Sequence, residues 1–253
     1  MSRPLVLLSN DDGYRAAGLE ALRGALAAEA DVIVCAPESE QSAASHSLSL
    51  HRPLRLTRHA EGLYAVDGTP ADCVYVALHA DGRVLPRKPD LVVSGLNHGV
   101  NLGDDVFYSG TVAAAREGAL RGIPSIAASA AHGTERSTAA VAVVRLALAL
   151  HEHRKHAPLL LNVNFPPGAG WALRATRLGA RVYHDSVEFR VDPRGRDYLW
   201  IGGNGVSHRP VAGSDTEAYD QGVVGVTPLV LDLWARSGQG ALELLISNLD
   251  APG

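Results

Sequence analysis

The 253-residue sequence is poor in cysteine, in lysine and in long apolar runs. Cys35 and Cys73 are not spaced as C-x-x-C, which argues against a disulfide framework or a cysteine zinc site, and we expect buried thiols. Lysine occurs only at positions 88 and 155, so arginine carries most of the positive charge. Since no 18-residue apolar run and no leader-like segment occurs, we expect a cytoplasmic protein with no membrane partner.

Common nucleotide and hydrolase signatures are also missing. No G-x-S-x-G elbow, P-loop or G-x-G-x-x-G follows a predicted strand, which disfavours acyl transfer, Walker-type ATP binding and dinucleotide binding. A net charge of -4 argues against a nucleic-acid polymer as partner. The hydrophobic content of 46% is ordinary for a chain with a real core, and the length suits one α/β domain with an appendage.

The first two-thirds of the chain alternate β-rich runs with helical patterns. Strands are predicted at residues 4–9, 31–36, 90–94, 124–129 and 158–164, with helices at 18–30 and 137–152 between them. Thr69, Pro70 and Asp72 form a helix start, and residues 54–66 are predicted to form a small hairpin or edge pair. This alternation predicts a mostly parallel sheet flanked by helices.

The pattern changes near residue 180, so we divide the single domain into a core, 1–180, and a second part, 181–253, that holds a hairpin arm and a C-terminal segment. Residues 182–191 and 197–201 flank a turn at 192–195, as in a long hairpin. The hairpin either protrudes as an arm or packs on its own domain. A strand-like stretch at 223–233, interrupted by Pro228, and a short apolar helix at 241–247 follow.

Two adjacent carboxylates, Asp11 and Asp12, stand where the first predicted strand runs into a glycine turn. The carboxyl ends of such strands face the ligand crevice of α/β proteins. Two like charges side by side repel unless a cation separates them, and oxygen ligands suit Mg²⁺, Mn²⁺ or Ca²⁺. The alternative is an Asx-type turn, since Asn-Asp-Asp-Gly is also ordinary turn chemistry.

Polar clusters follow two further strands, and parallel strands bring these loops to one crevice. The loop at 37–45 carries Ser39, Ser42 and Ser45, which serve either as helix caps or as hydroxyl ligands of a hard cation. The loop at 94–105 carries Asn97 and Asn101 among glycines and ends in a second acidic pair. We therefore expect a site built from three loops.

A helix is predicted from Val112 to Arg121, directly after Ser109, Gly110 and Thr111. Its unpaired N–H groups, its dipole and the two hydroxyls can bind a phosphate without lysine, although simple N-capping is the alternative. Two histidines of these loops, His46 and His98, are candidate proton carriers. Most of the other nine histidines are expected to be solvated.

A metal held by carboxylates beside a phosphate cradle indicates phosphoryl transfer, with water as the expected acceptor. Direct attack by an aspartate is the competing mechanism. We favour metal-activated water, because two carboxylates pinned by a cation are poor free nucleophiles. A nucleotide-binding regulatory protein without turnover and a metal-dependent phosphotransferase stay open as alternative functions.

The sequence resembles the SurE family, the stationary-phase survival proteins E. The segments that carry this resemblance span nearly the whole chain and include Leu8–Gly13, Gln41–Ser45, Gly68–Val74, Pro89–Asp105, Tyr108–Val112, Asn162–Pro166 and Thr227–Pro228. The sequence departs from the family pattern at Arg15–Gly18, at Ala43 in place of glycine, and at His98 and Val100. None of these departures removes a ligand.

The resemblance implies a Rossmann-like α/β core and a homodimer or homotetramer built by the arm and tail. It implies a metal-dependent 5′(3′)-nucleotidase that takes nucleoside monophosphates and, in some members, short polyphosphate. It further implies one divalent cation per subunit, Mn²⁺ or Mg²⁺, held by four residues: Asp11, Asp12, Ser42 and Asn97. We expect the two aspartates to be catalytic, and Asn10, Asn101, Ser109, Gly110 and Thr111 to bind phosphate or substrate.

Overall fold

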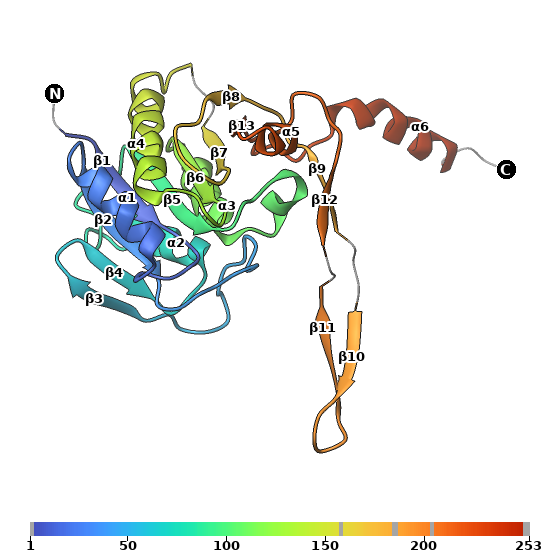
Figure 1. The fold of residues 1–253 in the computed structure, drawn as a ribbon, viewed down its shortest axis with the longest axis horizontal. Helices are drawn as coiled ribbons and strands as arrows, with labels where there is room; N and C mark the ends of the chain where they lie inside the picture. The colour runs from blue at the N-terminus through green and yellow to red at the C-terminus, as the bar shows by residue number, and fades with distance from the viewer. Residues whose placement is uncertain (1–2, 157–158, 184–186, 203–204, 250–253) are drawn as a thin grey trace.

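The computed structural model describes residues 3–156, 159–183, 187–202 and 205–249. Its centre is a nine-stranded sheet in the order β3-β4-β2-β1-β5-β6-β7-β13-β8 (Figure 1). The strands are β1 Leu5–Ser9, β2 Asp31–Pro37, β3 Leu56–Ala60, β4 Leu63–Val66, β5 Leu91–His98, β6 Ser125–Ala130, β7 Leu160–Phe165, β8 Leu173–Ala175 and β13 Val224–Pro228. All neighbouring strands pair in parallel except β3 with β4 and β7 with β13.

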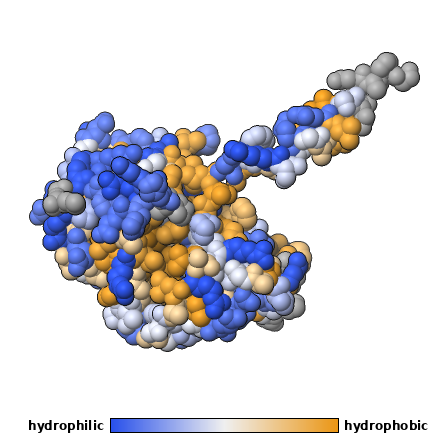
Figure 2. All heavy atoms as spheres, turned by 90° about the horizontal axis from the view of Figure 1, so that it is seen from above, coloured by the Kyte–Doolittle hydropathy of each residue, from blue (hydrophilic) through white to orange (hydrophobic). Residues whose placement is uncertain are grey.

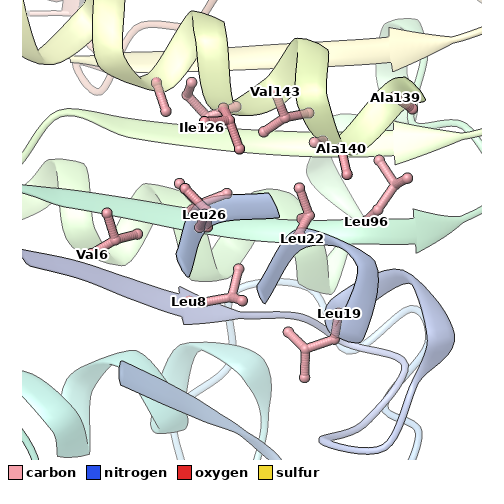
Figure 3. Packing of buried hydrophobic residues seen from close by; sticks show 14 of the residues in the cluster. Val6, Leu8, Leu19, Leu22, Leu26, Leu96, Ile126, Ala139, Ala140 and Val143 are labelled. Atoms are coloured by element: carbon pink, nitrogen blue, oxygen red, sulfur yellow. The ribbon is translucent and has the colours of Figure 1, made fainter. Parts of the chain in front are cut away.

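Helices cover both faces of this sheet. On one face, α1 (Ala17–Ala27) and α4 (Arg136–Glu152) pack leucines and alanines onto β1, β5 and β6 (Figure 3). On the other face, α2 (Pro70–His79) and α3 (Gly110–Leu120) lie side by side. Strands buried on both faces have nearly continuous apolar sequences, as Leu5–Leu8 shows. The predicted mostly parallel α/β fold is confirmed.

Local sequence explains where two of these helices begin. At α2, the Thr69 side chain accepts from the N–H of Asp72, and the Asp72 side chain accepts from the N–H of Thr69, which forms a complete capping box with Pro70 at the first helical position. At α3, the Ser109 hydroxyl accepts from the N–H of Val112. The predicted N-terminus of α2 is therefore confirmed, and α3 begins two residues earlier than predicted.

The second part of the chain builds a projecting arm. At its base β9 (Ala180–Tyr183) pairs with β12 (Val206–Arg209), and further out β10 (Val187–Val191) pairs with β11 (Asp197–Ile201). Every residue of β10 and β11 is exposed, and Figure 1 shows the hairpin pointing away from the sheet. Of the two sequence-based alternatives, the protruding arm is the one found. Residue 158 of the predicted strand 158–164 and residues 184–186 of the predicted hairpin lie outside the described residues.

The segment after the arm first packs into the core and then projects from it. Helix α5 (Asp215–Asp220) leads into β13, which lies between β7 and β8 in the main sheet, so part of the segment after residue 180 completes the core. The short 3-10 helix η2 (Arg236–Gly238) and α6 (Gln239–Leu249) then extend from the body (Figure 1). None of the described helices is long and apolar enough to cross a membrane.

Candidate functional site

A cavity of about 300 Å³ opens at the carboxyl ends of β1 and β5. Six of the residues predicted from the sequence line it together: Asp11, Ser42, Asn97, His98, Asn101 and Ser109. They come from the loops after β1 and β2, from the end of β5 and the loop that follows it, and from the start of α3. The convergence of separate loops at one edge of the sheet follows from the parallel strand order.

Asp11 is almost completely buried, and Thr111 holds both of its carboxylate oxygens. The Thr111 hydroxyl donates to Asp11 Oδ1, and the Thr111 backbone N–H donates to Oδ2 at 3.1 Å. Burial raises the pKa of Asp11 to about 6, although the hydrogen bonds from Thr111 act in the opposite direction. A carboxylate desolvated in this way is stabilised by a cation.

Asp12 links the loop after β1 to the end of β5. Its Oδ2 accepts a hydrogen bond from the backbone N–H of His98 at 3.1 Å. Burial raises the pKa of Asp12 above its ordinary value, and the hydrogen bond from His98 partly offsets that rise. The two neighbouring carboxylates therefore have different environments. Asp11 is hydrogen-bonded to Thr111 of α3, and Asp12 is hydrogen-bonded to His98 at the end of β5.

Ser42 and Asn97 supply the remaining oxygens of the predicted cation site. Ser42 Oγ donates to Glu40 at 2.8 Å, and the adjacent Ala43 has a left-handed φ of 57°, a conformation that glycine adopts more easily. Asn97 Nδ2 donates to the carbonyl of Gly99 at 2.8 Å, so its Oδ1 is not used in that bond. Both side chains line the same cavity as Asp11.

This donor set fits a hard divalent cation. It offers two carboxylates, a hydroxyl and an amide oxygen, and Mg²⁺ binds one or two carboxylates while keeping several waters. The buried Oδ1 of Asn10 has no described hydrogen-bond partner, so an acceptor also lies unpaired beside the aspartates. Among the described residues, no three His, Cys, Asp or Glu side chains form a metal-binding group.

The start of α3 differs in detail from the phosphate cradle that the sequence predicts. The hydroxyl and the N–H of Thr111 are both committed to Asp11, and the N–H of Val112 is committed to the Ser109 hydroxyl. Of the three predicted phosphate ligands at this helix start, Thr111 therefore positions Asp11, while the O–H of Ser109 and the N–H of Gly110 donate none of the described hydrogen bonds. A Cβ at Gly110 would lie 2.9 Å from Cβ of Asp11, so this close approach requires glycine.

Asn10 was also expected to bind substrate, but its side chain is completely buried and closes the turn. Its Nδ2 donates to the carbonyl of Gly13 at 2.9 Å. This bond is not the Asx-type turn that the sequence offered as an alternative, because in that turn the side-chain oxygen accepts from a backbone N–H, and Asn10 Oδ1 has no described partner. Asn10 shapes the loop that carries Asp11 and Asp12.

The two candidate proton carriers occupy different places. His98 lines the cavity, and the centroid of its ring lies 6.3 Å from that of His132, a residue for which the sequence predicts no role. His46 instead donates through Nε2 to Glu117 at 2.9 Å and lines a separate, largely apolar cavity of about 640 Å³. The structure thus places His98, and not His46, beside the acidic pair.

The arm base contributes further residues that the sequence did not predict. Arg181 and Tyr183, both on β9, donate to Asp105 and line the cavity next to Asn101. More than 70 residues separate them from Asp105 in the chain, so no local sequence pattern predicts the contact. Asp105, the second residue of the later acidic pair, therefore connects the base of the arm to the site.

Comparison with known proteins gives the family. A family model described as "Survival protein SurE" matches residues 6–185. The chain belongs to the SurE family. The resemblance predicted from the sequence motifs is thereby confirmed.

SurE relatives match the chain over almost its full length. A protein of Sorangium cellulosum named "5′-nucleotidase SurE" is 66% identical and covers 98% of each chain. One of the same name from Geotalea daltonii is 48% identical over 90% of this chain and 93% of its own. A crystal structure of a SurE protein from Aquifex aeolicus is 37% identical, covers 96% of this chain and 99% of its own, and superposes with a TM-score of 0.80.

Proposed function

We propose that this chain is a divalent-metal-dependent phosphatase that hydrolyses nucleoside 5′- and 3′-monophosphates, with short polyphosphate as a further substrate. The observation that carries the proposal is the cavity in which Asp11, Ser42, Asn97 and Ser109 meet at the start of α3. The enzyme class, 5′-nucleotidase, is that of the full-length SurE relatives, and it confirms the class predicted from the sequence.

We further propose that Asp11, Asp12, Ser42 and Asn97 hold one Mn²⁺ or Mg²⁺ per subunit. Such a cation supplies positive charge to the phosphoryl oxygens and makes a nearby water more acidic. Both oxygens of Asp11 accept hydrogen bonds from Thr111, so its carboxylate is held in one orientation. This restraint favours Asp11 as a fixed ligand over Asp11 as a nucleophile that must swing toward phosphorus.

The residues around the aspartates bind and orient the phosphoryl group in this proposal. The Ser109 hydroxyl uses one lone pair as the cap of α3, which leaves its O–H free to donate to a phosphoryl oxygen. Asn101, which lines the same cavity, offers its side-chain amide as a further donor. The N–H of Gly110, a residue that lies against Asp11, is another. His98 is the proposed source of the proton that the leaving alkoxide takes up, because this histidine lines the cavity.

We also propose that the protein forms a homo-oligomer, a dimer or tetramer, through the arm and α6. Phe189 and Trp200 on the arm are 71% and 62% exposed, and α6 exposes Leu242, Leu244, Leu245 and Ile246. Figure 2 shows hydrophobic side chains on α6 and on the face of the body beside its start. Exposed apolar side chains that lie together often mark an interaction surface, and we propose that a second copy of this chain packs against these residues.

The proposed activity is tested by phosphate release from a panel of 5′- and 3′-nucleotides, with Mn²⁺, with Mg²⁺ and with EDTA. We expect release that needs the metal and stops with EDTA. Nucleotide binding without release would instead indicate a regulatory protein. Product that appears only with an added alcohol would indicate a phosphotransferase.

A further inference from the structure

Asn101 is a loop residue whose backbone is held by side chains of a distant strand. It lies between β5 and the 3-10 helix η1 (Gly103–Phe107) and lines the same cavity as Asp11. Its N–H donates to Asn164 Oδ1 at 2.7 Å, and its C=O accepts from Asn162 Nδ2 at 2.8 Å and from Asn164 Nδ2 at 3.1 Å. Two side-chain amides of β7 thus satisfy the backbone N–H and C=O of Asn101, as the backbone of a neighbouring strand does within a sheet.

The Asn101 side chain is held in the same way from β6. Its Nδ2 donates to Ser129 Oγ at 2.8 Å. An amide nitrogen has two N–H groups, and the described hydrogen bonds use only one of them. The remaining N–H belongs to a residue that lines the same cavity as Asp11.

The strand register explains how these side chains reach one loop residue. β6 and β7 are parallel, with Ser129 opposite Asn164 and Ala127 opposite Asn162. Residues two apart on a strand share a face, so Asn162 and Asn164 both point toward Asn101. Asn162, Asn164 and Ser129 are 0%, 1% and 0% exposed. Buried amides are costly without partners, and the partner that these two share is Asn101.

We infer that Ser129, Asn162 and Asn164 are positioning residues that fix Asn101 so that its remaining amide N–H meets a phosphoryl oxygen in the cavity. The inference rests on the proposed function, because it takes a phosphoryl group as the ligand of this cavity. None of the three residues lines the cavity itself. They act on the ligand through Asn101 alone.

The test compares Ser129→Ala with a matched control on the same strand. Ser125 is also completely buried, but it donates to the carbonyl of Ile123 at the opposite end of β6. The measurements are the dissociation constant of inorganic phosphate by calorimetry with Mn²⁺, and kcat/KM for nucleoside monophosphates. We expect Ser129→Ala to weaken phosphate binding about fivefold, as for one lost hydrogen bond. Ser125→Ala should change it less than about twofold.

A double-mutant cycle separates positioning from general stability. In an Asn101→Ala background, Ser129→Ala should have no further effect on phosphate binding. Asn164→Asp is the second variant, since it keeps the acceptor for the N–H of Asn101 but turns an oxygen toward the carbonyl. It should weaken phosphate binding more than Ser129→Ala does, with circular dichroism unchanged.

Two results would overturn the inference. One is an equal effect of Ser129→Ala and Ser125→Ala, and the other is a Ser129→Ala effect that persists undiminished without the Asn101 amide. If the wild-type protein binds phosphate but hydrolyses no nucleotide, the proposed function is refuted but the inference is not. The dissociation constants of inorganic phosphate then still decide the role of Ser129. Absence of phosphate binding at millimolar concentration would refute both.

Discussion

Replacement of His46 by alanine should lower the stability of the protein and leave turnover intact. Glu117 is only 2% exposed, and its carboxylate has two described side-chain partners, His46 at 2.9 Å and Arg121 at 2.8 Å. Burial alone would raise the pKa of Glu117, but the hydrogen bonds from His46 and Arg121 bring it below its ordinary value. The carboxylate is therefore charged, and it depends on these donors.

The magnitude follows from the burial of that carboxylate. Loss of one hydrogen bond to a buried charged group costs about 2 kcal/mol. For a chain of this size, about 2 kcal/mol lowers Tm by about 4 to 8 °C. Because His46 lies in a different cavity from Asp11, kcat/KM for nucleoside monophosphates should stay within about twofold of wild type at a temperature well below Tm.

A second histidine provides the control. His208 Nδ1 lies 2.8 Å from Asp220 Oδ1, nearly the same distance, but the Asp220 side chain is 55% exposed. Exposed pairs contribute about 0 to 1 kcal/mol, so His208→Ala should lower Tm less, even with the loss of its ring contact to Tyr219. Thermal unfolding and steady-state kinetics of both variants decide the matter. An unchanged Tm with a strongly reduced kcat in His46→Ala would refute the reasoning and make His46 the proton carrier.

Three further outcomes are expected. Asp11→Asn and Asp12→Asn should each nearly abolish nucleotidase activity, and near-wild-type turnover in both would refute the assigned metal site. Replacement of residues 187–201 by a short glycine linker should reduce the mass measured by light scattering, and an unchanged mass would remove the arm from the oligomer contact. Glu117 has a folded-state pKa below its ordinary 4.5, so its stabilising contribution is present above pH 4.5 and is lost as pH falls through the lower value. The stability difference between wild type and Glu117→Gln should therefore shrink below about pH 4.5, and a difference independent of pH would contradict the pairing.

Most secondary structure of this chain is readable from local patterns. Thr69, Pro70 and Asp72 announce α2 because a capping box is made by residues three apart. Leu19, Leu22 and Leu26 announce α1, and the same three side chains face the sheet in Figure 3. The two Asp residues after β1 point to the edge of the sheet at which the cavity opens, since parallel strands share their carboxyl ends.

The roles of individual site residues were less readable. Thr111 looked like a phosphate ligand because it stands at a helix start, yet Asp11, which lies 100 residues earlier, takes both of its donors. His46 looked close to the site because it follows Ser42 by four residues. The chain turns between them, and His46 faces Glu117 on α3.

The sequence by itself determined the α/β class, the positions of most strands and helices, the acidic pair and the family. These depend on periodicity, caps and short motifs, which are properties of neighbouring residues. Only the tertiary structure decided which side chains share a cavity, that Asn162 and Asn164 hold Asn101, and that Arg181 reaches Asp105. Those contacts join residues 60 or more apart in the chain, and they exist because the strand order and register bring distant segments to one edge of the sheet.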